Sequence, residues 1–152
     1  MKVSDRGKIL FLDVRLFSQF WKKNSFFRFV IIGTSNTILM FIFYSLIIYV
    51  IGENQDTAGI AWGIAWGLEC CIAYMLHRKI TFQYIGSYSK SGFKTFLVYS
   101  ITLLGSSLTW DTIYSIYSIP YFFRWLGNLA AWGIISYLLL NYFAMPSKNR
   151  IT

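Results

Sequence analysis

The sequence predicts an all-α integral membrane protein, with four transmembrane helices in two parallel hairpin repeats and an amphipathic interfacial helix before them. Two observations carry this fold class: only 13% of the 152 residues are charged, and four long apolar segments follow one another along the chain. An average soluble domain carries about 25% charged residues. A chain this small has too much surface to hide a 56% apolar composition from water, so lipid is the expected solvent. The same composition excludes a disordered or nucleic-acid-binding tail.

The four expected spans lie at about residues 29–51, 58–76, 96–116 and 122–143. Each approaches the roughly 20 residues that a helix needs to cross about 30 Å of hydrocarbon. The first span carries no charge, the second only Glu69, the third Asp111 near its end, and the fourth Arg124 near its start. Pro120 and Pro146 flank the fourth span, where proline begins or stops a helix. Continuous apolar runs favour helices over barrel strands, which alternate in hydrophobicity.

The distribution of basic residues predicts the orientation. Of the 14 Lys and Arg residues, all but Arg124 lie before the first span, between the second and third, or after the fourth. Both termini are therefore expected in the cytoplasm, with two short loops outside. The net charge of +8 then faces the inner leaflet, where anionic lipids are the expected partners. The first span is expected to act as an uncleaved anchor, because it lacks a small-residue cleavage site.

The basic N-terminal segment carries a helical pattern of its own. Within residues 8–23, apolar side chains recur at helical spacing at Leu10, Val14, Phe17 and Trp21. This pattern predicts an interfacial helix on the inner leaflet, and the alternative is a loosely ordered basic tail. The chain is thus expected to comprise three parts, namely an amphipathic basic segment at 1–25, a four-helix transmembrane domain at 26–145 and a cytoplasmic tail at 146–152.

The ends of the second and fourth spans resemble each other. Residues 72–76 read Ile-Ala-Tyr-Met-Leu, and residues 135–139 read Ile-Ser-Tyr-Leu-Leu. Both segments are expected to end in the cytoplasm, so a duplication would produce two parallel hairpins. Convergent apolar composition is the alternative explanation.

Two motifs carry a resemblance to a known family. The first span opens with Phe-Arg-Phe at 27–29, followed by Gly33 and Asn36-Thr37. The second span ends in Tyr-Met-Leu-His-Arg-Lys-Ile-Thr-Phe at 74–82, and a weaker echo lies at 137–145. Together these resemble the GtrA-like family of small membrane proteins over about residues 26–145. The chain departs from the family pattern by His77 in place of Asn, and by Asn141 and Met145 in place of Arg and Phe.

The resemblance implies translocation of a polyprenyl-phosphate-linked monosaccharide across the bacterial cytoplasmic membrane, for cell-surface polysaccharide or teichoic-acid glycosylation. The implied partners are this lipid, the polyprenyl-phosphate glycosyltransferase that makes it and a polytopic glycosyltransferase that uses it; a homo-oligomer is left open. One alternative is a non-transporting subunit that binds or presents the lipid to a glycosyltransferase. Another is a proton-coupled exporter of lipophilic cations with Glu69 as the exchanging acid, which the basic cytoplasmic face disfavours.

Moving the phosphate of such a lipid across the hydrocarbon requires cationic side chains, because burying an unpaired anion is very costly. Arg28 and Arg78 are the preferred candidates, because they match the family motifs and arginine can grip a phosphate with two parallel hydrogen bonds. Lys79 and Lys94 lie at the same expected membrane face, and Arg124 is a candidate for the outer side. The alternative for the inner residues is that they only anchor helix ends at the headgroups. Arg124 could instead reach outward or pair with an acid.

Polar and aromatic residues within the spans predict a groove for the sugar. Glu69 lies where a carboxylate costs roughly 3 kcal/mol, so it should face the bundle interior. It shares a helix face with Trp62 and Trp66, and Asn36 and Asn128 add amide groups from other spans. The alternative for Glu69 is a protonated side chain bonded to a neighbouring helix, and for each Asn an ordinary interhelical hydrogen bond.

The second span carries a stripe of glycines, and the sequence shows no recognisable metal-site or catalytic motif. Gly59, Gly63 and Gly67 recur every four residues, which favours close helix packing against this chain or a second copy. Cys70 and Cys71 point to different faces and, with the single histidine of the chain, do not form a convincing metal site. No glycine-rich phosphate loop or catalytic triad is recognisable. We therefore expect no enzyme activity, no cofactor and no metal.

Overall fold

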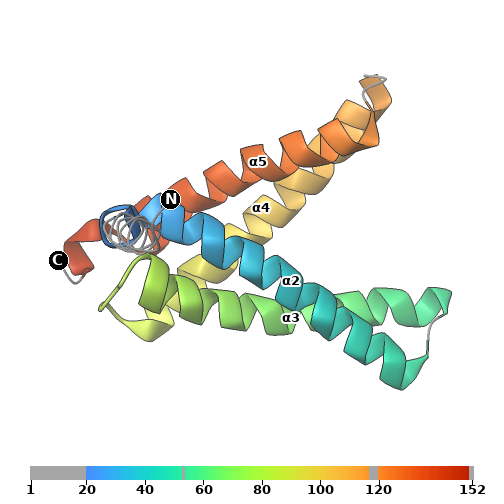
Figure 1. The fold of residues 1–152 in the computed structure, drawn as a ribbon, viewed down its shortest axis with the longest axis horizontal. Coiled ribbons are helices and arrows are strands. Elements are labelled where there is room, and N and C mark those ends of the chain that lie inside the picture. The colour runs from blue at the N-terminus through green and yellow to red at the C-terminus, as the bar shows by residue number, and fades with distance from the viewer. Residues whose placement is uncertain (1–19, 53, 117–119, 151–152) are drawn as a thin grey trace, which may run out of the picture.

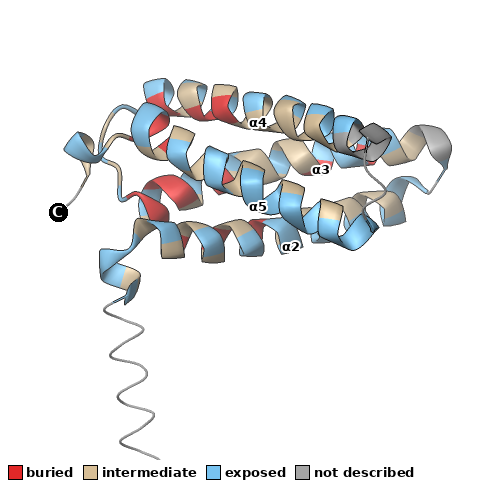
Figure 2. Ribbon diagram, turned by 90° about the horizontal axis from the view of Figure 1, so that it is seen from above, coloured by how far each residue is buried: buried red, intermediate tan, exposed pale blue. Residues whose placement is uncertain are grey.

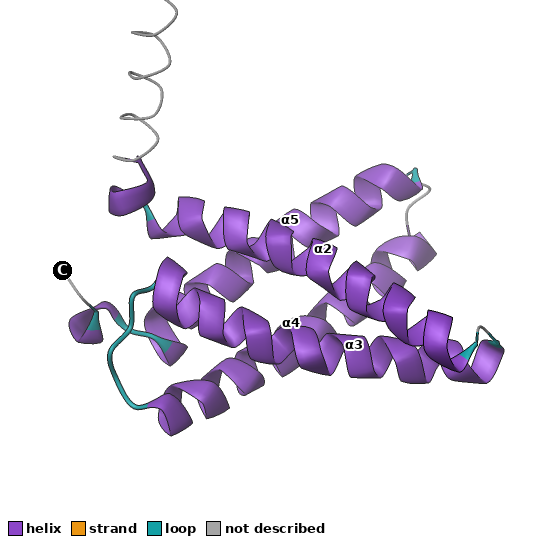
Figure 3. Ribbon diagram, turned by 60° about the horizontal axis from the view of Figure 1, so that its bottom comes forward, coloured by secondary structure: helices purple, strands orange, loops and turns teal. Residues whose placement is uncertain are grey.

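The computed structural model describes residues 20–52, 54–116 and 120–150. Four long helices fill most of these ranges, namely α2 (Ser25–Ile51), α3 (Gln55–Leu76), α4 (Tyr88–Ile116) and α5 (Tyr121–Leu139). Figure 3 shows these helices joined by short loops, and the described residues form no named strand. The all-helical fold class is confirmed. The predicted interfacial helix at 8–23 lies almost entirely outside the described residues.

Three helical segments are long and apolar enough to cross a membrane, namely Ser25–Ile51, Thr57–Thr81 and Tyr121–Ala144. The expected third span, at 96–116, is not among them. The reason is its composition: α4 begins with lysines at positions 90 and 94 and carries many Ser and Thr residues. Several of these hydroxyls donate to carbonyl oxygens of their own helix, as Thr109 does to Gly105 at 2.8 Å and Ser106 does to Leu103 at 3.0 Å.

The helices form two antiparallel hairpins, α2 with α3 and α4 with α5. Figure 1 shows the hairpins meeting where α2 begins and α5 ends, and spreading apart at their far ends. We call the first region the closed end. Its buried apolar core consists of Phe82, Val98, Leu140, Ala144 and Met145. Figure 2 shows that much of the buried surface gathers at this end, while large parts of the helices are exposed.

Both hairpins end in the same unusual local structure, which the sequence did not predict. α3 continues into the π-helix η1 (His77–Thr81), and α5 continues into the π-helix η2 (Leu140–Ala144). Each is closed by an equivalent backbone bond, from Phe82 N to His77 O and from Met145 N to Leu140 O, both 2.8 Å. Short π-helical turns within α-helices are rare and occur often at functional sites.

The other boundaries follow from local capping. α2 begins four residues before the expected span, because the Asn24 side chain accepts hydrogen bonds from Phe26 N and Phe27 N at 3.0 and 3.2 Å. After η2 the chain forms the short 3₁₀ helix η3 (Ser147–Asn149). This tail packs back on the protein, since Ile85 N donates to Asn149 O at 2.8 Å.

Candidate functional site

All four long helices contribute to one cavity of about 340 Å³ between the two hairpins. Its lining combines polar side chains with three tryptophans, Trp66, Trp125 and Trp132. The principal polar residues are Asn36, Glu69, His77, Tyr99, Ser106 and Asn128. Mixed polar and aromatic linings of this kind are typical of sites for small polar molecules.

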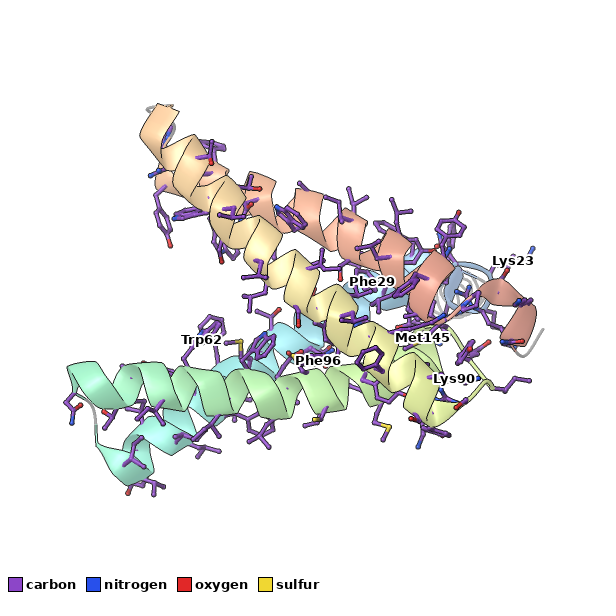
Figure 4. All side chains as sticks on the ribbon, turned by 180° about the vertical axis from the view of Figure 1, so that it is seen from behind. Lys23, Phe29, Trp62, Lys90, Phe96 and Met145 are labelled. Atoms are coloured by element: carbon purple, nitrogen blue, oxygen red, sulfur yellow. The ribbon has the colours of Figure 1, made fainter. Side chains whose placement is uncertain are left out.

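Four of the five residues predicted for a sugar groove line this cavity, namely Asn36, Trp66, Glu69 and Asn128. The fifth, Trp62, is 44% exposed and does not line it. Its ring stacks on Trp66 with centroids 6.4 Å apart and an interplanar angle of 8°. Figure 4 shows Trp62 projecting from α3 toward the side where α4 lies. The structure therefore brings most of the predicted set together, and their binding of sugar stays a prediction.

The buried amide of Asn36 is the most distinctive feature of the cavity. The residue is only 3% exposed, and neither its Oδ1 nor its Nδ2 has a hydrogen-bond partner among the described residues. The Tyr99 hydroxyl, on the opposing helix α4, is buried in the same condition. Each unsatisfied buried group costs about 1–3 kcal/mol, so native proteins retain such groups where a ligand or water completes them.

Asn128 is satisfied on one side only. Its Nδ2 donates to the carbonyl oxygen of Ser106 at 3.3 Å, which is the interhelical bond that the sequence left open as an alternative. Its Oδ1 is buried and has no partner in the described ranges. The amide therefore joins α4 to α5 and still presents one acceptor to a ligand.

Glu69 and His77 are two titratable residues that line the cavity. Glu69 is the one carboxylate among the described lining residues, and no Lys or Arg side chain joins it there. His77 is fixed by a 2.9 Å hydrogen bond between its Nδ1 and Thr81 Oγ1, and its ring stacks on Phe29 with centroids 4.9 Å apart. The cavity thus accepts hydrogen bonds readily but carries no cation for a phosphate.

Arg28, a predicted phosphate contact, is 5% exposed and directs its donors to backbone carbonyls. Its Nε and Nη2 donate to Thr81 O at 3.0 and 2.8 Å. Its Nη1 donates to Trp21 O and Lys22 O at 2.5 and 3.0 Å. These contacts agree with the alternative that Arg28 holds helix ends together. A direct contact between Arg28 and phosphate stays a prediction.

Arg78 is bound in a similar way and is 2% exposed. Its Nη1 donates to Ser91 Oγ at 2.5 Å, and its Nη2 donates to the carbonyl oxygen of Gly86. The guanidinium also lies over the rings of Tyr88 and Tyr84, at 3.6 and 5.1 Å from their centroids. Arg78 therefore holds the connection between η1 and α4 against the start of α4.

The remaining predicted phosphate residues lie apart from one another. Lys79 is exposed. Lys94 Nζ donates to Phe143 O at 3.2 Å and lies 4.8 Å from the centroid of that ring. Arg124 lies over the ring of Trp110 at 5.3 Å. None of the five predicted cations lines the main cavity, so the structure does not assemble them into one phosphate site.

Sequence reasoning missed one further arginine. Arg150 Nη2 donates to Asn141 Oδ1 at 2.8 Å and to Met145 O at 2.6 Å, and its guanidinium lies over Phe82 at 4.8 Å. Burial lowers the pKa of Arg150, although an arginine stays protonated at neutral pH. Arg150 secures the end of η2, much as Arg28 secures the end of η1. Its position in a short tail without a motif gave no signal for this role.

The predicted glycine stripe does not pack within the chain. Side chains added at Gly59, Gly63 or Gly67 would meet no described atom within 4 Å. Among the described residues the stripe therefore has no close neighbour, and packing against a second copy, which the sequence left open, stays a prediction. The close approach lies instead at Gly105, where the Trp132 ring fills the space of the missing side chain. Recognising it requires knowledge of which helix faces α4.

Comparison with known proteins identifies a single family. The model of the family described as the GtrA/DPMS transmembrane domain matches residues 28–146. The match includes Arg28 and Arg78, both π-helices and every residue that lines the main cavity. No curated protein and no solved structure is similar enough to the chain to match it.

Proposed function

The chain belongs to the GtrA/DPMS transmembrane-domain family, and on that premise we propose that it translocates a polyprenyl-phosphate-linked monosaccharide across the bacterial cytoplasmic membrane. The lipid would serve cell-surface polysaccharide or teichoic-acid glycosylation. With its apolar helices, the chain is a multi-pass membrane protein. One observation carries the proposal: the buried amide of Asn36, which has no hydrogen-bond partner in the part of the chain that the structure describes, lines a cavity together with Glu69 and Asn128.

The proposal includes four spans, with both termini in the cytoplasm. α4 supplies the additional span, because its 29 residues exceed the roughly 20 needed and its internal hydroxyls bond to its own carbonyls. A hydroxyl satisfied in this way costs less in lipid than a free one. The lysines of α4 lie near the closed end, which would then face the cytoplasm.

The two hairpins are proposed to be parallel copies of one ancestral unit. A constant offset of 63 residues relates Tyr74 to Tyr137 and the first residue of η1 to the first residue of η2. The same offset relates the starts of α2 and α4. It also pairs Asn36 with Tyr99, which both line the cavity and both have a buried polar group with no hydrogen-bond partner among the described residues. This agreement supports a duplication over convergent apolar composition.

The chemistry of the cavity suits a single sugar ring. Sites for small molecules usually measure about 300–1,000 Å³, and this cavity is at the small end of that range. Sugar hydroxyls can donate to Glu69 and to the free Oδ1 atoms of Asn36 and Asn128. Trp66 offers a flat apolar surface to the ring.

A second cavity extends this site toward the far ends of α4 and α5. It measures about 330 Å³ and shares Ser106, Trp125 and Asn128 with the main cavity. Its other lining residues are Ser107, Trp110 and Tyr121. Two polar and aromatic cavities with shared lining residues support passage of the sugar along the protein, because a protein that only binds the sugar needs a single cavity.

Reconstituted transport tests the proposal. Full-length protein in proteoliposomes is supplied with labelled polyprenyl-phosphate monosaccharide, and the label on the opposite leaflet is followed over time. Asn36→Leu is expected to slow translocation roughly tenfold, the equivalent of about 1.4 kcal/mol. The matched control is Ser35→Ala, whose hydroxyl is exposed and bonds to Ile31 O. Equal rates with and without the protein would contradict the proposal.

A second candidate is a non-transporting subunit that presents the same lipid to a glycosyltransferase. The observation in its favour is that Arg28 and Arg78 are locked in contacts within the chain. In either version the chain itself catalyses no reaction, and separate glycosyltransferases make and use the lipid. The subunit version predicts stable co-purification with a polytopic glycosyltransferase and full function after Glu69→Gln.

A further inference from the structure

A third cavity, of about 430 Å³, lies between α2 and α5. Its lining is mainly apolar and includes Phe26, Val30, Leu129 and Ile134. Unlike the main cavity, it has no carboxylate, amide or imidazole among its described lining residues. It offers a groove for hydrocarbon beside a site for polar groups.

The apolar groove and the main cavity adjoin each other. They share Phe29 and Gly33 from α2, and Leu129, Gly133 and Ser136 from α5. A molecule that occupies both would have its polar part between the hairpins and its apolar part between α2 and α5. This arrangement fits an amphiphile and does not fit a free sugar or a simple hydrocarbon.

Two glycines form the join. Gly33 and Gly133 line both cavities, and a side chain added at either position would meet no described atom within 4 Å. The space between the two cavities is therefore free of side chains at these two positions. Gly33 lies eight residues after the start of α2, and Gly133 six residues before the end of α5. At about 1.5 Å per residue, both lie roughly 10 Å from the closed end.

The neighbouring side chains sharpen the boundary between polar and apolar surfaces. The Thr37 hydroxyl donates to Gly33 O at 3.1 Å, so its donor is not available to a molecule in the groove. The Phe29 ring is held between His77 and Tyr137, at centroid distances of 4.9 and 5.3 Å. Phe29, which lines both cavities, is thus held in place by its two aromatic neighbours.

We propose that the groove between α2 and α5 is a lateral portal that holds the isoprenoid chain next to the phosphate, while the sugar occupies the main cavity. This inference rests on the proposed function and adds where the lipid enters. We assign an isoprenoid as the occupant because the groove shares its edge with the cavity that, in the proposed function, takes the sugar of the same lipid. The remainder of the chain stays in the bilayer, so no apolar surface has to cross a polar region.

Photolabelling tests the portal without requiring transport. Full-length protein in nanodiscs of phosphatidylethanolamine and phosphatidylglycerol receives a sugar-free polyprenyl phosphate with a diazirine on its first isoprene unit. Labelled peptides are expected from the groove faces of α2 and α5. Gly133→Leu should reduce this labelling roughly tenfold, because its side chain fills the join. Gly127→Leu is the matched control: it lies on the same helix, has equally open space and lines none of the three cavities.

Folding is checked by thermal unfolding, and Gly33→Leu provides a second variant from the other side of the join. Equal labelling in Gly133→Leu and Gly127→Leu, or labels confined to α3, would overturn the portal. Full competition by added phosphatidylglycerol would overturn the isoprenoid as occupant, and protection of the groove by a crosslinked second copy would do the same. If the portal is labelled as expected while the wild-type protein moves no lipid, the portal stands and the proposed function fails.

Discussion

At the closed end, Arg28 and Arg78 are buried and hydrogen-bonded to groups of their own chain, whereas in the main cavity the buried amide of Asn36 has no partner among the described residues. Both regions bury strongly polar side chains in an apolar protein. At the closed end, Arg28 bonds to the end of the first hairpin and Arg78 bonds to the start of α4, so both hold helix ends in place. In the cavity, both amide atoms of Asn36 and the Oδ1 of Asn128 have no partner among the described residues. This difference places stability at the closed end and ligand recognition between the hairpins.

The largest effect is expected from Arg78→Ala. The substitution removes a buried cation from two tyrosine rings and leaves the Gly86 carbonyl and Ser91 hydroxyl short of a donor. Hydrogen bonds to charged groups contribute about 1.5–3 kcal/mol each, so the free energy of unfolding should fall by about 3 kcal/mol or more. Thermal unfolding in detergent measures this loss. The control is the next residue, Lys79, which is exposed, and Lys79→Ala should unfold like the wild type.

Arg28→Ala should produce the next largest loss of stability, about 2–3 kcal/mol, because it leaves Thr81 O and the carbonyls before α2 without a charged donor. Arg28→Lys should recover only part of it, since an ammonium cannot reach several carbonyls in a fixed fork. Unfolding curves of the two variants check this order. If Arg28→Ala unfolds like the wild type yet no longer binds the lipid phosphate, Arg28 belongs to the lipid-binding site. That result would contradict the assignment of stability to the closed end.

Asn36→Leu should show the opposite pattern. Removing an amide without partners should leave the unfolding temperature unchanged or raise it by a few degrees. Translocation should nevertheless fall roughly tenfold, as described above. Unfolding and transport are measured on the same preparation. A large loss of stability in this variant would show that Asn36 is structural and would remove the contrast between the two regions.

The smallest effect is expected from Trp62→Ala. Trp62 lies outside the cavity and only stacks on Trp66, so its loss should slow translocation by about twofold. Trp66→Ala should cost several times more, because Trp66 lines the cavity. Initial rates in proteoliposomes separate the two. Equal losses would place both rings in the route of the sugar.

Hydropathy and polarity predicted the parts of the molecule that lipid constrains. Three of the four expected spans are confirmed as long apolar helices. The inward position of Glu69, Asn36 and Asn128 follows from the cost of polar groups in hydrocarbon, which leaves them few other places to lie. The same reasoning does not reveal a partner from a distant segment. The partners of Arg28 are backbone carbonyls 53 residues along the chain and just before α2, and no side-chain pattern marks a carbonyl.

The remaining differences have the same origin. The packing glycine is Gly105 and not the stripe at Gly59, Gly63 and Gly67, because close approach depends on which helix is adjacent. The π-helices η1 and η2 depend on how each hairpin closes against the core. α4 is less apolar than the other helices because it carries many Ser and Thr residues, although several of their hydroxyls bond within the helix, as in Thr109.

The rate of translocation per folded molecule, compared between Arg28→Lys and Asn36→Leu, tests the account most directly. Dividing the rate by the folded fraction removes the contribution of stability. The account predicts that Arg28→Lys then matches the wild type, while Asn36→Leu stays roughly tenfold slower. A normal rate in folded Asn36→Leu, together with a lost rate in folded Arg28→Lys, would move recognition to the closed end and contradict the account.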